Sequence, residues 1–205
     1  MTVLLALLRH AETEWSRDKR VQGRTDVPLC DDARAGLQRS RLPRIAADMQ
    51  VFSSPLARCT ETATQLGLQH AVVEPRLVEM SWGQWEGCRL PQLRGELGVA
   101  MAANEARGFD FTPPRGESPR QVLARVRPWL VQLARAGKPS LAVTHRGVIR
   151  VVFALATGWD MLGRPPAKLD WAALQVFALD ATGAPTVHRL NLALEADHAR
   201  VVHAP

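Results

Sequence analysis

The sequence predicts an α/β fold with a mostly parallel sheet, on the basis of three observations. Residues 3–8 form an unbroken apolar run of strand length, as expected of a strand that is covered on both faces. Residues 140–144 form a second short apolar run. Near the end of the chain, strand candidates at 172–179 and 186–190 flank the turn sequence Asp180-Ala-Thr-Gly183, which is typical of an antiparallel hairpin.

The first half of the chain contains one clear helix start. Serine is a good helix cap and proline suits the first turn, so Ser54-Pro55 predicts a helix. Arg58 should then lie near a helix N-terminus, where free backbone N–H groups favour an anion, although a lone arginine also suits a solvated helix position. The other elements expected here are a loop over 14–20, an irregular segment over 21–29, a helix over 31–47, and short strands over 50–53 and 71–74.

The second half contains a distinctive loop and a strong helix signal. Residues 76–87 are rich in tryptophan and glycine, which suits a functional loop more than a plain connector, although Glu79 alone could be an ordinary surface glutamate. Ser118-Pro119 followed by Gln121 forms a capping box, which predicts a helix from there to about Ala136. The remaining elements expected are a helix over 90–107, a proline-broken segment over 109–115, a helix over 147–157 and a loosely held tail over about 195–205.

Length and composition favour one soluble domain that covers residues 1–205. The chain has no internal repeat, linker or low-complexity block, and its 46% hydrophobic and 22% charged residues are typical of globular proteins. A formal net charge of +6 favours anionic partners. The arginines are scattered, however, and aromatic residues make up only 5% of the chain. We therefore expect a small anionic substrate and no nucleic acid.

The cysteines and the apolar stretches indicate a cytoplasmic protein. Cys30, Cys59 and Cys88 are widely spaced without a metal-ligand pattern, and their odd number suits free thiols in a reducing compartment. The apolar run at the start is too short for a membrane span and lacks the basic leader of a signal peptide. We accordingly expect no membrane partner.

The two apolar strands end in the same pair of functional groups. The first run leads into Arg9-His10 and the second into His145-Arg146. Ligand crevices in open α/β sheets lie beyond the carboxyl ends of the strands. One such pair alone would suit the start of an ordinary polar loop, but two pairs predict a cationic pocket that contains imidazoles.

Six motifs occur along residues 4 to about 160: Leu8-Arg9-His10-Ala11-Glu12-Thr13, the segment 22–29 (QGRTDVPL), the segment 53–63 (SSPLARCTETA), Glu79 with 82–87 (WGQWEG), Gly116-Glu117-Ser118, and Thr144-His145-Arg146-Gly147. Their types and order resemble the histidine phosphatase superfamily, also called the phosphoglycerate mutase-like family. One Arg-His box would be weak support, whereas six collinear motifs are specific. The resemblance implies a three-layer αβα sandwich, with a mostly parallel sheet and an antiparallel edge strand.

The resemblance also implies hydrolysis of a phosphate monoester through a phosphohistidine. His10 would be the nucleophile, Glu79 the general acid and base, and His145 a donor to the phosphoryl oxygens. Arg9 and Arg58 would complete the catalytic set. The substrate-binding residues would be Ser16, Gln22, Gly23 and Arg146.

The chemistry of these residue types agrees with the implied roles. A nucleophilic histidine must be neutral, and nearby arginines lower its pKa from about 6.5. Their planar forks also suit a phosphoryl group, so we expect neither a metal nor another cofactor. Glu79 would need a pKa raised from about 4.3 to act as an acid near neutral pH, through burial or an incoming phosphate.

Five positions depart from the family pattern, and two of them, Cys30 and Ala33, replace a usual Thr/Ser cap and a glycine at the following helix, which concerns stability alone. Ala11 replaces the usual glycine, which requires only that the backbone tolerate a Cβ. Ser16 replaces an asparagine that contacts phosphate in many members, so one hydrogen bond is shortened or lost. Arg146 replaces a common glycine, and a substrate contact and a solvent-facing position are equally compatible with the sequence.

The phosphatase branch, which includes broad-specificity and alpha-ribazole phosphatases, fits best. Mutases of the family typically carry longer insertions over the active site, whereas only about thirty residues separate Gly87 from Gly116. The alternatives are a cofactor-dependent phosphoglycerate mutase and a non-catalytic member that binds phosphorylated ligands. We expect a small phosphorylated metabolite, selected by residues 88–115, as the substrate. The sequence leaves its identity and the oligomeric state open, and a homodimer would be in keeping with the family.

Overall fold

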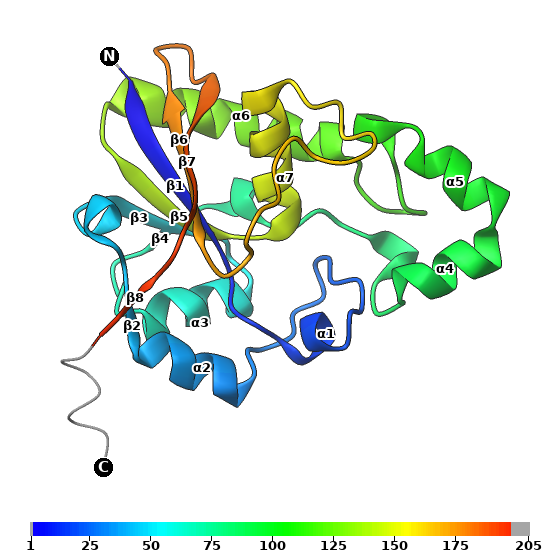
Figure 1. Ribbon diagram of the computed structural model, residues 1–205, viewed down its shortest axis with the longest axis horizontal. Coiled ribbons are helices and arrows are strands. Elements are labelled where there is room, and N and C mark those ends of the chain that lie inside the picture. Colours follow the sequence, from blue (N-terminus) through cyan, green and yellow to red (C-terminus); the bar gives the residue numbers. More distant parts are fainter. Residues whose placement is uncertain (1, 198–205) are drawn as a thin grey trace.

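In the computed structural model, which describes residues 2–197, a six-stranded mixed sheet forms the centre of the molecule (Figure 1). The strand order is β4-β3-β5-β1-β6-β7. The first four are parallel, and β6 pairs antiparallel with both β1 and β7, so that a hairpin forms one edge. The strands are β1 (Val3–Arg9), β3 (Gln50–Ser53), β4 (Val72–Val73), β5 (Ser140–Thr144), β6 (Leu174–Leu179) and β7 (Pro185–Leu192). The predicted α/β sheet is confirmed.

Helices cover both faces of this sheet, as expected of a three-layer sandwich. On one face lie α6 (Pro119–Ala136) and α7 (Arg146–Thr157), and on the other lie α2 (Asp31–Gln38) and α3 (Ala57–Gln65) (Figure 1). Successive residues of β1 serve opposite faces: Leu5 and Leu7 join the α6–α7 core, and Ala6 and Leu8 join the α2–α3 core. The unbroken apolar run of β1 follows from burial on both sides.

The pairing of β1 with β5 brings the two histidine-bearing strand ends together. Arg9 lies opposite Thr144, and the backbone N–H of His10 donates to the carbonyl of Thr144 at 2.9 Å. Since both strands run in the same direction, His10 and His145 both lie just beyond the carboxyl ends of the strands. This is the arrangement that the sequence predicted for a pocket.

A helical excursion, between Gln84 and Pro114, extends away from the sheet (Figure 1). It contains α4 (Leu90–Leu97) and α5 (Val99–Glu105), because the helix expected over 90–107 breaks at Gly98, whose φ of +50° belongs to the left-handed region. The 3₁₀ turn Gly108–Asp110 follows. The two ends of the excursion are held together, as the Gln84 N–H donates to Pro114 O (3.0 Å) and the Glu117 N–H to Ser81 O (2.8 Å).

Three further elements differ from the sequence prediction. The helix expected over 31–47 ends at Gln38, because Ser40–Arg41 extend to pair with Glu195–Ala196, and Pro43 disfavours a helical conformation at residue 42. The loop expected over 14–20 contains one helical turn, α1 (Glu14–Arg17). Glu195–Ala196, expected in a loose tail, forms β8 and pairs with β2 (Ser40–Arg41), whereas residues 198–205 lie outside the described residues.

The remaining short elements are the 3₁₀ turns Arg44–Ala46, Pro75–Leu77 and Gly83–Trp85. Within residues 2–197, no helix combines the length and apolar character needed to cross a membrane.

Candidate active site

A cavity of about 770 Å³ lies at the carboxyl ends of β1 and β5. Its walls come from these strand ends, the segment 16–22, the loop around Glu79, the α4–α5 excursion and the start of α7. Six of the predicted site residues line it: Arg9, His10, Ser16, Gln22, Glu79 and Arg146. The other three, Gly23, Arg58 and His145, are buried outside its lining.

His10 is held as a neutral imidazole with one free nitrogen. Its Nδ1 lies 2.7 Å from the carbonyl of Ala11, an acceptor, so Nδ1 carries the proton and Nε2 keeps its lone pair. Burial, with the charges of Arg9 and Arg58, holds the pKa of His10 well below its usual range. The Cβ of Ala11 causes no backbone strain, because this residue does not adopt a positive φ.

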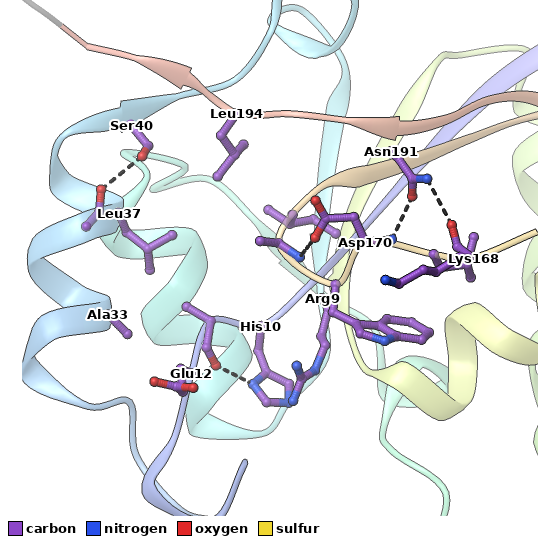
Figure 2. A pocket seen from close by; sticks show the side chains of 16 residues that line it. Arg9, His10, Glu12, Ala33, Leu37, Ser40, Lys168, Asp170, Asn191 and Leu194 are labelled. Atoms are coloured by element: carbon purple, nitrogen blue, oxygen red, sulfur yellow. Dashed lines mark hydrogen bonds between the residues drawn. The ribbon is translucent and has the colours of Figure 1, made fainter. Parts of the chain in front are cut away.

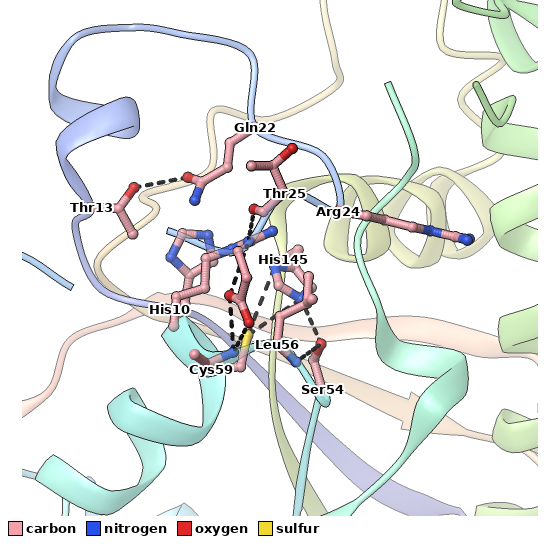
Figure 3. Close-up of polar contacts among 12 residues, drawn as sticks. His10, Thr13, Gln22, Arg24, Thr25, Ser54, Leu56, Cys59 and His145 are labelled. Carbon is pink, nitrogen blue, oxygen red and sulfur yellow. Dashed lines mark hydrogen bonds and ion pairs between the residues drawn. The ribbon is translucent and has the colours of Figure 1, made fainter. Parts of the chain in front are cut away.

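His145 lies beside His10 and is fully buried. The two ring centroids are 5.3 Å apart, and His145 Nε2 forms a 2.7 Å hydrogen bond with Ser54 Oγ (Figure 3). The Sγ of Cys59 also packs 3.4 Å from this nitrogen. Burial, followed by the charge of Arg58, lowers the pKa of His145 well below its usual range. Both imidazoles are therefore neutral.

The N-terminus of α3 differs from the sequence prediction. The helix begins at Ala57 with Leu56 as its cap, and the hydroxyl of Ser54, the expected cap, instead contacts His145. The Ala57 N–H donates to both carboxylate oxygens of Asp26, at 3.0 and 3.1 Å. The anion at this helix end is thus a side chain of the protein itself.

Arg58 is fully buried and organises the loop in front of it. One terminal nitrogen donates to Thr25 O (3.0 Å) and the other to Gly23 O (2.6 Å). Gly23, predicted to bind substrate, thus contributes a carbonyl that orients Arg58. It also has no room for a side chain, because a Cβ would lie 2.1 Å from an oxygen of Glu86.

Three buried donors without a protein partner belong to residues of the cavity or next to it: Arg9 and Gln22 line the cavity with His10, and the charge of the buried Arg58 acts on His10. Among residues 2–197, the Nε atoms of Arg9 and Arg58 and the Nε2 of Gln22 are buried without a hydrogen-bond acceptor. The hydroxyl of Thr13 donates to Gln22 Oε1 at 2.8 Å, which leaves the amide nitrogen of Gln22 free to donate (Figure 3). Buried donors are nearly always satisfied, so this arrangement suits an oxyanion.

Ser16 lines the cavity, but its hydroxyl is used locally. It accepts from the Thr13 N–H at 3.0 Å and donates to the Thr13 carbonyl at 2.9 Å, within the capping box of α1. Ser16 therefore supports Thr13, and through it the amide of Gln22, in the conformation observed.

Glu79 is a buried carboxyl group that contacts α7. Its Oε1 accepts from the Met80 N–H at 2.8 Å, and both of its oxygens lie 3.1 Å from the Gly147 N–H. Burial raises the pKa of Glu79, although these N–H groups act in the opposite direction. A Cβ on Gly147 would lie only 2.3 Å from Oε1, so glycine is needed at this position for the contact.

Sequence reasoning assigned no role to several supporting residues. Glu86 accepts from the backbone N–H groups of Arg24, Thr25 and Trp82 and from the Thr25 hydroxyl, which joins the 23–25 loop to the Trp-rich loop. Glu86 lies in the WGQWEG motif, so the sequence singled out this position but did not indicate what its carboxylate binds. The others are Thr13, which orients Gln22; Ser54, which contacts His145; and Thr62, which accepts from the Ala11 N–H.

A second cavity, of about 880 Å³, shares Arg9 and His10 with the first (Figure 2). Its other walls come from α2, including Ala33 and Leu37, and from the segment 168–172. Gln22, Glu79 and Arg146 do not line it. The first cavity is therefore the candidate active site, because the carboxyl group of Glu79 and the unpartnered amide nitrogen of Gln22 accompany His10 there.

Comparison with other proteins identifies relatives of this chain. The chain is 33% identical over 196 residues to the bifunctional protein Rv2228c of Mycobacterium tuberculosis, covering 91% of this chain and 53% of that protein. This chain thus spans about half the length of that relative. It is 28% identical over 205 residues to a 2,3-bisphosphoglycerate-dependent phosphoglycerate mutase of Methylobacterium radiotolerans, covering 93% of this chain and 91% of the mutase.

Solved structures share the fold. TTHB049 from Thermus thermophilus superposes with a TM-score of 0.70 at 31% identity, covering 94% of this chain and 100% of the other. Mycobacterial glucosyl-3-phosphoglycerate phosphatase Rv2419c superposes with a TM-score of 0.73 at 23% identity, covering 93% of this chain and 100% of the other, which supports the fold alone. The profile of the histidine phosphatase superfamily (branch 1) matches residues 5–193, and the chain belongs to that superfamily.

Proposed function

We propose that the chain is a metal-independent phosphatase that hydrolyses a small phosphate monoester through a phosphohistidine on His10. The observation that carries this proposal is the free Nε2 of a neutral, buried histidine accompanied by three buried donors without protein acceptors. Phosphoryl transfer mainly requires positioning and positive charge around the equatorial oxygens, and Arg9 and Arg58 supply that charge.

In the first step, His10 Nε2 attacks phosphorus and the bond to the ester oxygen breaks. The leaving alkoxide takes a proton from the carboxyl group of Glu79, whose raised pKa favours the protonated form. The donors of Arg9, Gln22 and Arg58 bind the phosphoryl oxygens, and removal of one such donor typically lowers the rate by about 10²–10³-fold.

In the second step, water attacks the phosphohistidine. The carboxylate of Glu79 accepts a proton from that water, the N–P bond breaks, and inorganic phosphate leaves. His10 then returns to its starting state, with the Nδ1 proton still donated to Ala11 O. Each turnover thus restores both His10 and Glu79.

Arg146, next to the Gly147 that binds Glu79, is exposed to solvent. We infer from this exposure that water reaches the cavity beside Glu79, which favours hydrolysis over return of the phosphoryl group. The mutase alternative remains a second candidate, because the relative from Methylobacterium radiotolerans is named a phosphoglycerate mutase. A mutase would have to exclude water from the phosphohistidine and return the phosphoryl group to a second substrate.

The decisive experiment measures phosphate release from p-nitrophenyl phosphate, 3-phosphoglycerate and alpha-ribazole phosphate in EDTA, for the wild type and His10→Ala. We expect release that is unaffected by EDTA and abolished by the substitution. Equal release by both proteins would exclude His10 as nucleophile. Isomerisation of 3-phosphoglycerate with a bisphosphoglycerate primer and little phosphate release would establish the mutase, and ligand binding without turnover would indicate a non-catalytic member.

A further inference from the structure

Two arginines on one face of α7 line the active-site cavity without a polar partner. Arg146 and Arg150 are four residues apart, so they are neighbours on the helix surface. Arg146 stacks on Trp171, with its guanidinium carbon 4.9 Å from the ring centre, and Arg150 stacks on Trp159 at 4.8 Å. Within the described part of the chain, neither guanidinium has a hydrogen-bond acceptor or a carboxylate partner.

This placement is unfavourable for the stability of the helix. Both cations lie in the first two turns of α7, where the helix dipole disfavours positive charge, and like charges four residues apart repel. The first turn contains no acidic residue to offset them. Burial, together with the charge of Arg146, lowers the pKa of Arg150 to about 10. Apolar side chains would pack against the same tryptophans without these costs.

The other charged groups of the cavity wall are used elsewhere or lie at its rim. Arg94 pairs with Glu105 at 2.7 Å, and Arg20 pairs with Asp18 at 3.3 Å. Lys19 is exposed, and its ammonium group is carried by a long, flexible side chain. The carboxyl group of Glu79 is buried against the start of α7. Arg146 and Arg150 therefore supply positive charge without an ion-pair partner in the cavity that contains His10, and only the buried Glu79 acts electrostatically on Arg146.

We propose that Arg146 and Arg150 form a subsite for a second anionic group of the substrate. The inference rests on the proposed phosphatase function and specifies its substrate class: compact phosphate monoesters whose alcohol part carries a carboxylate or a second phosphate. Arg146 adjoins Gly147, whose N–H binds Glu79. Since Glu79 protonates the leaving group, the subsite lies on the leaving-group side of the phosphoryl site.

Paired esters that differ only in the second anion test this inference. The carboxylate pair is 3-phosphoglycerate and glycerol 3-phosphate, and the phosphate pair is 1,3-propanediol bisphosphate and 3-hydroxypropyl phosphate. The measured quantity is the ratio of kcat/KM within each pair, and the pair with the larger wild-type ratio identifies the anion. We expect Arg146→Gln/Arg150→Gln to reduce that ratio by about 10- to 100-fold, the effect of losing charge-assisted hydrogen bonds.

Two further variants separate the subsite from general charge effects. Arg150→Lys keeps the charge but loses the planar fork, so its ratio should fall between those of the wild type and the double variant. Arg127→Gln removes the same charge from an exposed position on α6, outside the cavity lining, and should leave the ratio unchanged. Thermal unfolding checks that each variant is folded.

An unchanged ratio in the double variant would overturn the inference, including the case in which the charged and neutral members of a pair lose activity equally. If the wild type hydrolyses none of these esters, the proposed function fails separately. Calorimetric binding of the same pairs then tests the subsite by itself. Tighter binding of the charged member in the wild type, lost in the double variant, would support it, and equal binding of both members would refute it.

Discussion

Gly147→Ala should disable the general acid while leaving the fold intact. The added Cβ would lie 2.3 Å from Glu79 Oε1, whereas ordinary contacts begin at 3.4 Å, so the carboxyl group must retreat by about 1 Å. It would also weaken its bonds with the Gly147 N–H. A misplacement of about 1 Å can lower a rate by about 10²-fold. Gly147 lies within α7 at a negative φ, so alanine suits the helix itself.

The assay compares an alkyl phosphate, whose alkoxide needs a proton, with p-nitrophenyl phosphate, whose leaving group does not. We expect kcat to fall by about 10²-fold on the alkyl ester and only a few-fold on the aryl ester. Gly95→Ala in α4 is the matched control, because a Cβ there meets nothing within 4 Å, and its kinetics should be unchanged. Equal losses on both esters, or no loss on either, would refute the assignment of Glu79.

Three further results are expected. The value of kcat/KM for alkyl esters should fall as pH rises through the raised pKa of Glu79. Activity should persist below pH 6.5, because the lowered pKa of His10 keeps that imidazole neutral. An activity optimum in alkaline solution would contradict both expectations. Glu79→Gln should raise the Tm at pH 8 but not at pH 4, because the buried carboxyl group lowers stability progressively as pH rises from its unfolded-state pKa through its raised folded-state pKa, and a lower Tm at pH 8 would argue against the shift. Orthovanadate, which mimics the five-coordinate phosphoryl group, should inhibit competitively, whereas full activity at millimolar vanadate would count against an oxyanion pocket around His10.

The features that the sequence predicted well depend on strong local signals. The apolar runs of β1 and β5 and the capping box of α6 are each encoded within a few consecutive residues. Because parallel strands end at one edge of a sheet, those local signals also placed His10 beside His145. The family resemblance added the remaining site residues, of which Ser16, Gln22, Glu79 and Arg146 line the same cavity as His10.

The features that the sequence did not predict depend on contacts between distant segments. Asp26 caps α3 across 31 positions, and Glu86 joins backbone groups more than 60 positions away. Both carboxylates lie in motifs of the sequence, but the neighbouring residues do not reveal these distant partners. Sequence reasoning also treated Arg58 as a ligand for the phosphoryl group alone, although two of its nitrogens bind Gly23 O and Thr25 O. Such roles become visible only when the chain is folded.

The two ends of the α4–α5 excursion are hydrogen-bonded to each other, so we expect that this segment can be replaced without disturbing the rest of the fold. The pairs Ser81–Glu117 and Gln84–Pro114 bring both ends of the intervening chain to one place. A change in its length therefore leaves the end-to-end geometry unaltered, and doubling the length of a flexible loop costs only about 0.6 kcal/mol in closure entropy. Segments of different length and composition can be grafted between these ends to alter which esters enter, while the strand ends that carry His10 and His145 stay in place.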